Sequence, residues 1–385
     1  MTSLQHLSKN RGEWAEIVAI FRSFQSARVP TVRSGDNGLL LTGGAVLVSE
    51  IRIERNNQFV DFRFNRDDQE SGYLSIFVNG SQVAQFSKLE VVQDCEQVCR
   101  EIQKQAQINK KGNFAVPDAD LLIQKYHLGT GKTKSSLKQD LEMILIDPDG
   151  IPLPRQGFSI KSFVGADPTI FNTSRSARFK FRLDGAKSVE AFAIANEISN
   201  NKPKSWVQAL FQRLNAINAF TQTIEIPEPK FERNLELLDA HMPTVLGALL
   251  LQAYCSGEMS ISECLKRVIL SDPLGFGGDA ETFYTYRVKH FLRAAALGFS
   301  SSKPWDGNEG ADGGMLFVNK SWSLSCMLSS RKDFENYLLK SCRFESPSSS
   351  ISKHGGYGKL TKEWHGTYVD LLLQVRECDP FNKSN

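Results

Sequence analysis

Residues 137–165, LKQDLEMILIDPDGIPLPRQGFSIKSFVG, constrain the fold of this 385-residue chain more than any other stretch. Two runs with an apolar pattern flank Pro148, Asp149 and Gly150, which are residue types that favour turns. The stretch therefore predicts a β-hairpin, whose apolar face would be formed by Leu141, Met143, Leu145, Phe158 and Ile160. The same runs carry an aspartate, a glutamate and a lysine, where a plain buried strand would carry none.

These ionisable residues are expected on the other face of the hairpin. A turn centred in the middle of the stretch places Asp140 opposite Ser159. Side chains alternate along a strand, and residues opposite each other point to the same side of the sheet. We therefore expect one cluster that contains Asp140, Glu142, Ser159 and Lys161. A register slip of two residues would keep this cluster, whereas a slip of one would destroy it.

A carboxylate and a lysine on adjacent strands suit the cleavage of phosphodiesters. Carboxylate oxygens are ligands for a hard cation such as Mg²⁺, and a lysine can stabilise the charge that develops on a phosphate. PD-(D/E)xK nucleases have this arrangement, with an aspartate on one strand facing (D/E)-x-K on the next. Here Ser159 occupies the second acidic position. The pattern by itself also fits a solvated hairpin face.

The composition is that of a folded protein, with 41% hydrophobic and 23% charged residues. A net charge of +3 permits a polyanionic partner without requiring one. We expect a cytoplasmic location and no membrane contact, because no apolar run reaches the length of a membrane span and the first residues do not resemble a secretory signal. Seven cysteines without a CxxC pair indicate reduced thiols and no structural zinc. No phosphate-binding loop, histidine metal motif or Gly-x-Ser-x-Gly elbow is present.

The remaining chain predicts an α/β (α+β) fold, with a mixed central sheet flanked by helices and additional helical and strand elements. Helices are expected at 11–27, 95–107, 118–128, 205–220, 242–255 and 331–342, and strands within 39–92 and 313–328. The chain is divided into an N-terminal helix and β-rich segment (1–110), a core hairpin region (111–185), a helical segment (186–300) and a C-terminal block of strands and a helix (301–385). The C-terminal block is expected to form one compact unit with the core.

Four blocks of the chain resemble the HpaII restriction endonuclease family, and they occur in the family's order from about residue 9 to residue 376. NRGEWAEI is similar to the family's opening Lys-Gly-Glu-Trp-Ser-Glu. The hairpin, with GFSIKSFVGADPTIFNTS, is similar to its core block. KPWDGNEGADGG and RKDFENYLLKSCRFESPSSS are similar to its third and closing blocks. Residues 36–95 and 187–290 carry no such resemblance.

The resemblance implies a Mg²⁺-dependent, sequence-specific endonuclease of double-stranded DNA with a PD-(D/E)xK core, in which Mn²⁺ can replace Mg²⁺. A protective methyltransferase is usually encoded beside such an enzyme. Asp140, Lys161 and Ser159 match the family's aspartate, lysine and serine. One further metal carboxylate is needed. Glu16 is favoured because nucleases of this fold often take a carboxylate from the first helix, while Glu13 and Glu142 stay open.

Candidate DNA contacts follow the hairpin and occur again near the C-terminus. They are Asn172, Ser174, Arg175, Ser176, Arg178, Lys180 and Arg182, and then Arg343, Lys353 and His354. In RFKFRL the cations alternate with apolar residues, as on a strand with one basic face. A solvated strand face and an ordinary surface loop fit the same residues, and KPWDG is expected to be a structural corner.

Two other functions remain open, a structure-specific DNA repair nuclease and a non-cleaving DNA-binding protein on the nuclease fold. Ser159, in the place of an acid, motivates the second. A palindromic DNA site would be matched by a two-fold symmetric homodimer. A large monomer that cuts the strands one after the other is the competing arrangement.

Overall fold

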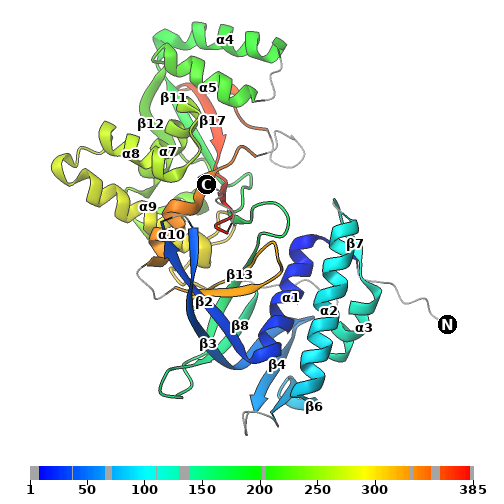
Figure 1. Cartoon of the computed structure of the whole chain (residues 1–385). Helices are drawn as coiled ribbons and strands as arrows, with labels where there is room; N and C mark the ends of the chain where they lie inside the picture. The colour runs from blue at the N-terminus through cyan, green and yellow to red at the C-terminus, as the bar shows by residue number, and fades with distance from the viewer. Residues whose placement is uncertain are drawn as a thin grey trace. The chain divides into compact units, whose positions relative to one another are not determined.

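The computed structural model describes residues 8–36, 38–65, 72–109, 111–129, 139–201, 205–329, 333–347 and 356–381. The chain forms two compact units (Figure 1). Unit 1 consists of Met1–Pro168, Glu309–Phe334 and Asp379–Asn385, and unit 2 consists of Thr169–Asn308 and Glu335–Cys378. The unit boundary after Pro168 therefore runs through the expected core segment 111–185, and the expected block 301–385 is shared between the units. The mixed α/β class predicted from the sequence is confirmed.

Unit 1 is built on a large mixed sheet. Within the described residues it has nine strands, in the order β2 (Arg28–Gly35), β14 (Leu324–Leu328), β13 (Gly314–Val318), β9 (Gln156–Ser162), β8 (Leu141–Ile146), β3 (Gly38–Arg55), β4 (Gln58–Asn65), β5 (Tyr73–Val78) and β6 (Ser81–Ser87). The pairs β9–β13 and β14–β2 are parallel, and the other neighbours are antiparallel. The long strand β3 also pairs with β2 through its first half, so the pairings from β2 by way of β14, β13, β9, β8 and β3 close into a circuit.

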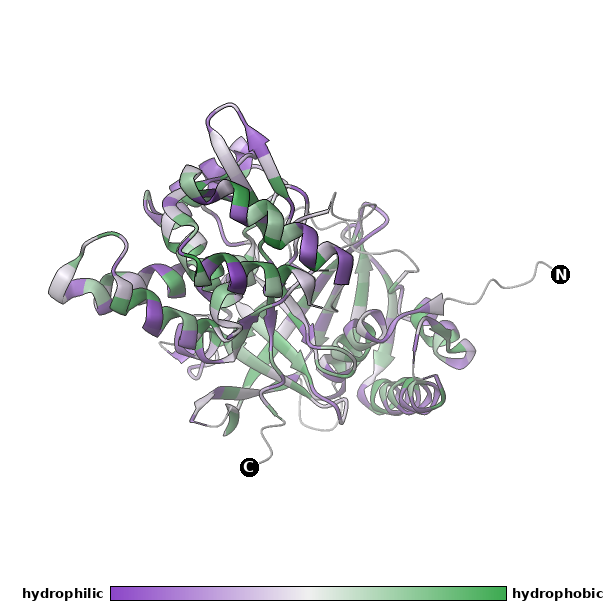
Figure 2. Cartoon of the chain, turned by 90° about the horizontal axis from the view of Figure 1, so that it is seen from above, coloured by the Kyte–Doolittle hydropathy of each residue, from purple (hydrophilic) through white to green (hydrophobic). Residues whose placement is uncertain are grey.

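Helix α1 (Arg11–Ser26) packs against β2, β9, β13 and β14 of this sheet and against α2 (Lys88–Ile108). It begins with a capping box, because Asn10 and Glu13 bond each other's main-chain N–H groups. Its apolar residues Trp14, Ile17, Val18, Phe21 and Phe24 recur with helical spacing and are all buried. The unit is completed by α3 (Pro117–Lys125) and by the short pair β1 (Ser8–Lys9) and β7 (Phe114–Ala115). Most helices carry hydrophobic residues on one side and hydrophilic residues on the other (Figure 2).

The β8–β9 hairpin has the predicted register at its open end. Leu141 lies opposite Phe158 and Glu142 lies opposite Gly157. Near the turn, however, Ile146 bridges Pro152, which is a register one residue away. One extra residue on the β9 side therefore lies between the turn and the paired strands. This irregularity restores the register that the cluster of Asp140 and its neighbours requires.

Unit 2 contains two smaller sheets and most of the helices. The sheets have the strand orders β12 (Phe220–Glu225), β11 (Arg178–Leu183), β17 (Gly366–Leu372), β16 (Leu360–Glu363), and β10 (Thr169–Phe171), β18 (Val375–Glu377), β15 (Cys342–Phe344). The helices are α4 (Ser188–Asn201), α5 (Trp206–Ala216), α6 (Pro229–Leu238), α7 (Met242–Ser256), α8 (Ile261–Ser271) and α9 (Ala280–Leu297), with α10 (Asp333–Ser341) beginning in unit 1. Short 3-10 turns lie at Gly185–Lys187 and Gly277–Asp279.

The predicted helix 205–220 is too long. It ends at Ala216, and the next residues turn through Asn218, whose φ of 53° is left-handed, into β12. All seven cysteines are free thiols. In the described part of the chain, every helix is too short or too polar to span a bilayer.

Candidate active site

Asp140, Ser159 and Lys161 form one chain of hydrogen bonds at the open end of the β8–β9 hairpin. Lys161 Nζ donates to Ser159 Oγ at 2.8 Å, and Ser159 Oγ donates to Asp140 Oδ2 at 3.4 Å. The main-chain N–H of Ile160 donates to the same carboxylate oxygen at 2.6 Å. Ser159 is buried, with 3% of its surface exposed. The structure therefore links three of the four residues predicted from the hairpin pattern, with the serine between the lysine and the aspartate.

The surroundings of Asp140 act on its charge in opposite directions. Burial raises the pKa of Asp140, while the charge of Lys161 and the hydrogen bonds from Ile160 and Ser159 act to lower that pKa. The main effect is the burial, which removes water that would solvate the carboxylate. A buried carboxylate that has lost its solvating water is stabilised when a cation binds to it.

Helix α1 brings a second carboxylate, Glu16, close enough for its charge to interact with that of Asp140. Burial, and then the charge of Asp140, raise the pKa of Glu16 to about 7, against the lowering effects of Arg55 and Lys9. A carboxyl group whose pKa is raised by burial and by a neighbouring carboxylate is a common feature of functional sites. Glu13, the neighbouring alternative, has its Oε2 engaged with the Asn10 N–H at 2.9 Å in the helix cap.

Glu142, the third alternative, belongs to a network of ion pairs. Its Oε1 accepts from Gln139 Nε2 at 2.8 Å, and its Oε2 lies 3.7 Å from Arg155 Nε. Arg155 also pairs with Glu50 at 2.5 Å. A cavity of about 20 Å³, room for one water-sized ligand, borders both Asp140 and Glu142. The structure thus leaves Glu142 beside Asp140 but with cationic partners of its own.

Arg55, at the end of β3, is a member of this site that the sequence reasoning missed. Only 9% of its surface is exposed. Its Nε donates to Leu128 O at 3.2 Å, and its Nη1 donates to Glu54 O at 3.1 Å. Its charge lowers the pKa of both Glu16 and Asp140. The available signal was the alternation Ile51, Ile53, Arg55, which places a cation on the apolar face of a strand.

The donor atoms of the site suit a hard cation. Among the described residues, no group of three or more His, Cys, Asp or Glu side chains is gathered tightly enough to hold a metal ion by itself. Mg²⁺ in enzymes is commonly bound by one or two carboxylates, keeps several waters and takes the remaining ligands from substrate phosphates. Asp140 and Glu16 offer carboxylate oxygens alone, and so they fit Mg²⁺ completed by water and phosphate.

The residues predicted to contact DNA lie in unit 2, whereas the candidate catalytic residues lie in unit 1. Strand β11 has the predicted alternation, with buried Phe179 and Phe181 and a polar face. On that face Arg178 is ion-paired with Asp370, and Lys180 is ion-paired with Glu363. The basic stripe is therefore matched by carboxylates from β17 and β16.

The other predicted contacts differ in their surroundings. Asn172 and Arg175 are exposed. Ser174 Oγ lies within hydrogen-bonding distance of Ser176 and of the buried Ser301, at 2.9 Å from the latter. Arg343 is on β15, opposite Arg376 of β18. Lys353 and His354 lie outside the described residues.

The predicted structural corner at KPWDG is present in unit 2. Trp305 donates its main-chain N–H to Asn234 Oδ1 at 3.0 Å and its Nε1–H to Asn308 O at 2.9 Å. Its ring packs edge-on against Phe299. These contacts fasten the segment to the helical part of the unit, which is the role expected of a corner.

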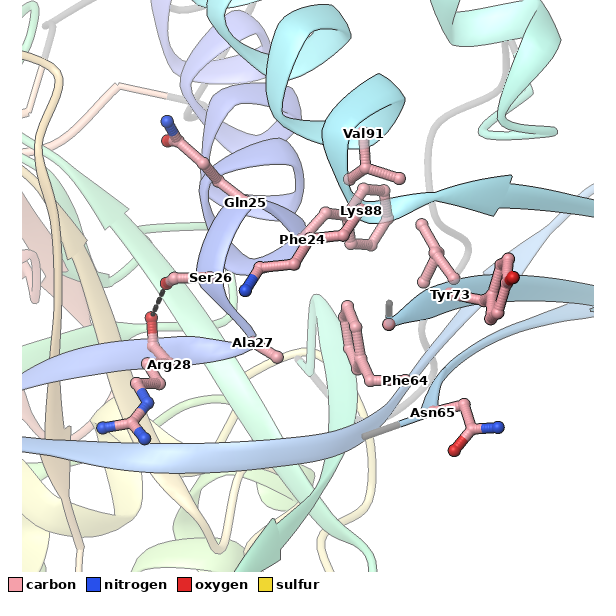
Figure 3. Close-up of a pocket in the computed structure, with 12 residues that line it drawn as sticks. Phe24, Gln25, Ser26, Ala27, Arg28, Phe64, Asn65, Tyr73, Lys88 and Val91 are labelled. Carbon is pink, nitrogen blue, oxygen red and sulfur yellow. Dashed lines mark hydrogen bonds between the residues drawn. The ribbon is translucent and has the colours of Figure 1, made fainter. Parts of the chain in front are cut away.

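A separate pocket of about 240 Å³ lies where α1 ends and α2 begins (Figure 3). Phe24 of α1, Phe64 of β4 and Val91 of α2 contribute apolar surface, and Lys88 adds a cation. Ser26 Oγ turns toward the main-chain oxygen of Arg28, at 2.8 Å. The described lining residues include no carboxylate and none of the candidate catalytic residues.

Comparison with known proteins agrees with the site. The chain is 27% identical over 380 residues to the type II restriction enzyme HpaII of Haemophilus parainfluenzae, and the alignment covers 97% of this chain and 99% of that protein. No solved structure matches the chain. A model of the HpaII restriction endonuclease family matches residues 10–377, a range that includes every candidate catalytic residue. With the match extending over nearly all of its length, the chain belongs to the HpaII restriction endonuclease family.

Proposed function

We propose that the chain is a type II restriction endonuclease that cleaves both strands of DNA at a specific sequence, by Mg²⁺-dependent hydrolysis of phosphodiester bonds on a PD-(D/E)xK core. The observation that carries the proposal is the hydrogen-bonded group of Asp140, Ser159 and Lys161 with Glu16 beside it. The family match over nearly the whole chain supports the reaction class.

Each residue of the candidate active site has a different role in the proposed hydrolysis. Asp140 and Glu16 would hold the metal ion, which when bound polarises the scissile phosphate and lowers the pKa of a coordinated water. Lys161 presents its ammonium group to the charge that develops on the phosphate oxygens. Ser159 keeps that ammonium group in place through the 2.8 Å hydrogen bond. The Ile160 N–H fixes the orientation of the Asp140 carboxylate.

The partners follow from the reaction. Double-stranded DNA is the substrate, and a palindromic site would be met by a homodimer. An enzyme of this kind works in the cytoplasm, where host DNA needs protection by a methyltransferase encoded nearby. Of the predicted contacts, the exposed Asn172 and Arg175 are the best placed to meet DNA without first breaking an ion pair.

A digest of unmethylated phage DNA tests the function. With Mg²⁺ or Mn²⁺ we expect discrete fragments whose ends map to one short sequence. With Ca²⁺ we expect specific binding without cleavage, because Ca²⁺ occupies oxygen sites without supporting the hydrolysis. Cutting that continued in excess EDTA would contradict the metal requirement.

The digest, extended to branched and mismatched DNA and to a gel-shift assay, separates the two alternative functions. A structure-specific repair nuclease would leave linear duplex intact and cut branched or mismatched DNA. A non-cleaving DNA-binding protein, for which the neutral Ser159 speaks, would shift DNA in a gel with every metal and cut it with none. Discrete fragments from linear duplex would exclude both.

A further inference from the structure

Arg55 is a buried cation placed beside two carboxylates. It continues the buried positions Ile51 and Ile53 on the face of β3, so its side chain points to the side on which α1 packs. Helix α1 carries Glu16 on that side. The charges of Glu16 and Asp140 both act on Arg55 and favour its charged form, while burial disfavours it.

The guanidinium group is held from two directions. Leu128 O and Glu54 O accept its Nε and Nη1 hydrogens. Gly129 packs so closely that a Cβ there would lie 3.3 Å from Arg55 Cβ. The side chain is thus fixed between β3 and the segment after α3, and its cation cannot turn freely to solvent.

A buried charge is costly unless an opposite charge compensates it. The two main-chain acceptors named above are neutral, whereas the charges of Glu16 and Asp140 favour the charged form of Arg55, so these carboxylates contribute to the compensation. The reverse also holds, since Asp140 and Glu16 repel each other and need a positive charge to stay close together in the absence of metal.

We propose that Arg55 is a positioning residue that acts as an internal counter-cation, holding Asp140 and Glu16 together in the metal-free enzyme and weakening their binding of divalent ions. The inference rests on the proposed function, because it takes these two carboxylates as the metal ligands. Metal binding must then overcome the repulsion between the ion and the guanidinium group. The enzyme would bind its metal weakly until the phosphate oxygens of DNA are added to the site.

Arg55→Gln tests the proposal, because glutamine keeps hydrogen-bond donors for the Leu128 carbonyl and removes the charge. Arg55→Lys keeps the charge and serves as the rescue. Arg63→Met is the matched control, since Arg63 pairs with Glu50 and Asp61 on the same sheet. Ca²⁺ binding is measured calorimetrically at pH 8.5 without DNA, and thermal unfolding is measured in EDTA and in saturating Ca²⁺.

We expect Arg55→Gln to bind Ca²⁺ about tenfold more tightly, as expected from removing one unit charge near a divalent site in a protein interior. It should unfold at a lower temperature in EDTA and recover most of the loss in Ca²⁺. Arg55→Lys should keep an affinity near that of the wild type, and Arg63→Met should leave the affinity unchanged. Equal losses of stability in EDTA and Ca²⁺, with unchanged affinity, would overturn the proposal in favour of a purely structural arginine.

A double variant covers the case in which Arg55→Gln does not fold. Adding Glu16→Gln removes the repulsion that the arginine compensates, so the double variant should fold and be the more stable of the two in EDTA. If the double variant also fails to fold, the counter-cation role is wrong.

The proposed function has its own readout in the same series. Ca²⁺ binding by the wild type that Asp140→Asn abolishes places the metal at this site. A wild type without any Ca²⁺ binding in the presence of DNA would instead count against the metal-dependent function. The coupling between Arg55 and Glu16 in EDTA is measured independently of that result.

Discussion

Ser159 joins a lysine to an aspartate without adding a charge of its own. A glutamate in this position would pair directly with Lys161 and would add a third acid next to Asp140 and Glu16. The serine accepts a hydrogen bond from the lysine, and in the proposed reaction it leaves the positive charge of the lysine for the substrate. The number of carboxylates in the site is therefore small, and the arrangement depends on each of them.

Asp140→Asn and Lys161→Ala should each lower the rate of DNA cleavage by at least about a hundredfold, the usual scale for losing one electrostatic stabiliser. Asparagine keeps the size of the side chain and removes the charge that would hold the metal. Single-turnover cleavage measures the rate. Binding of specific DNA in Ca²⁺ is the control, and Lys161→Ala should change it far less, because most affinity comes from many distributed phosphate and base contacts. Folded variants that bind and cut at near-normal rates would show that another site performs the cleavage.

Because the pKa of Glu16 is raised to about 7, the proposed metal binding should depend on pH. A carboxyl group with a raised pKa favours the metal-free fold below its ordinary pKa, and this contribution is lost as the pH rises through about 7. Metal binding needs the ionised form, so Ca²⁺ affinity should rise by about tenfold per pH unit up to about pH 7 and then level off. Calorimetric titrations from pH 5.5 to 8.5 measure this. Glu16→Gln should remove the slope, whereas a slope retained in that variant would assign it to another acid.

The residues of the site were predictable to different degrees. Alternation along two strands was enough to group Asp140, Ser159 and Lys161, because their neighbours in space are also neighbours in the hairpin. Glu16 was a candidate through the family resemblance, since nothing within the helix itself indicates which strand it faces. Arg55 was missed because its role depends on how β3 and α1 pack together.

In the β8–β9 hairpin, the predicted strand register is correct, although the turn from which it was predicted is not. A symmetric turn predicted the pairing of Leu141 with Phe158, and the structure has that pairing. The turn itself is shifted by one residue, as the Ile146–Pro152 bridge shows. The extra residue on the β9 side compensates for the shift. Such irregularities depend on the contacts of the loop with the rest of the sheet, and the local sequence does not reveal them.

Gly157 of β9 tests this element directly. A Cβ at this position would lie 2.0 Å from Gly310 O and 2.6 Å from Gln139 Oε1, so alanine requires the main chain at Gly310 to move away. Gly157→Ala should lower the free energy of unfolding by about 2 kcal/mol or more, the cost of overpacking a close contact. Urea unfolding measures the change. Gly278→Ala is the matched control, because no atom lies within 4 Å of its Cβ position. Equal stability of the two variants would contradict the tight contact.

The strands β16, β17 and β18 could not be predicted from the sequence pattern. The helices were recognisable because their apolar residues recur with a regular spacing over many residues. Strand β17 pairs with β11, and β18 pairs with β10 and β15, so the partners of these short strands lie elsewhere in the chain, while β16 pairs only with its neighbour β17. Strand propensity depends strongly on such partners, and so pattern alone did not identify these elements.

At the scale of the whole molecule, the candidate catalytic residues and the predicted DNA contacts fall in different units. Asp140, Ser159, Lys161 and Glu16 belong to unit 1, and the predicted DNA contacts that the structure describes belong to unit 2. Many of the cations in unit 2 are already ion-paired, as Arg178 is with Asp370. Binding of DNA by Arg178 would therefore first have to break this ion pair.

A palindromic recognition sequence would require two copies of the candidate active site, one for each DNA strand. We expect two chains bound per DNA site, related by a two-fold axis. Analytical ultracentrifugation of the complex with a short specific duplex in Ca²⁺ measures the stoichiometry. A complex of one chain per duplex that still yields double-strand breaks would replace the dimer by sequential cutting of the two strands.

The order of strands in unit 1 has a consequence for protein synthesis. Strands β13 and β14 lie between β9 and β2 in the sheet, yet they come from residues that follow the whole of Thr169–Asn308 in the chain. While a nascent chain is leaving the ribosome, β9 and β2 therefore have unpaired edges until Gly314–Leu328 has emerged. The strand that carries Ser159 and Lys161 gains its second neighbour only then. A growing polypeptide therefore completes the sheet around Ser159 and Lys161 only late in translation.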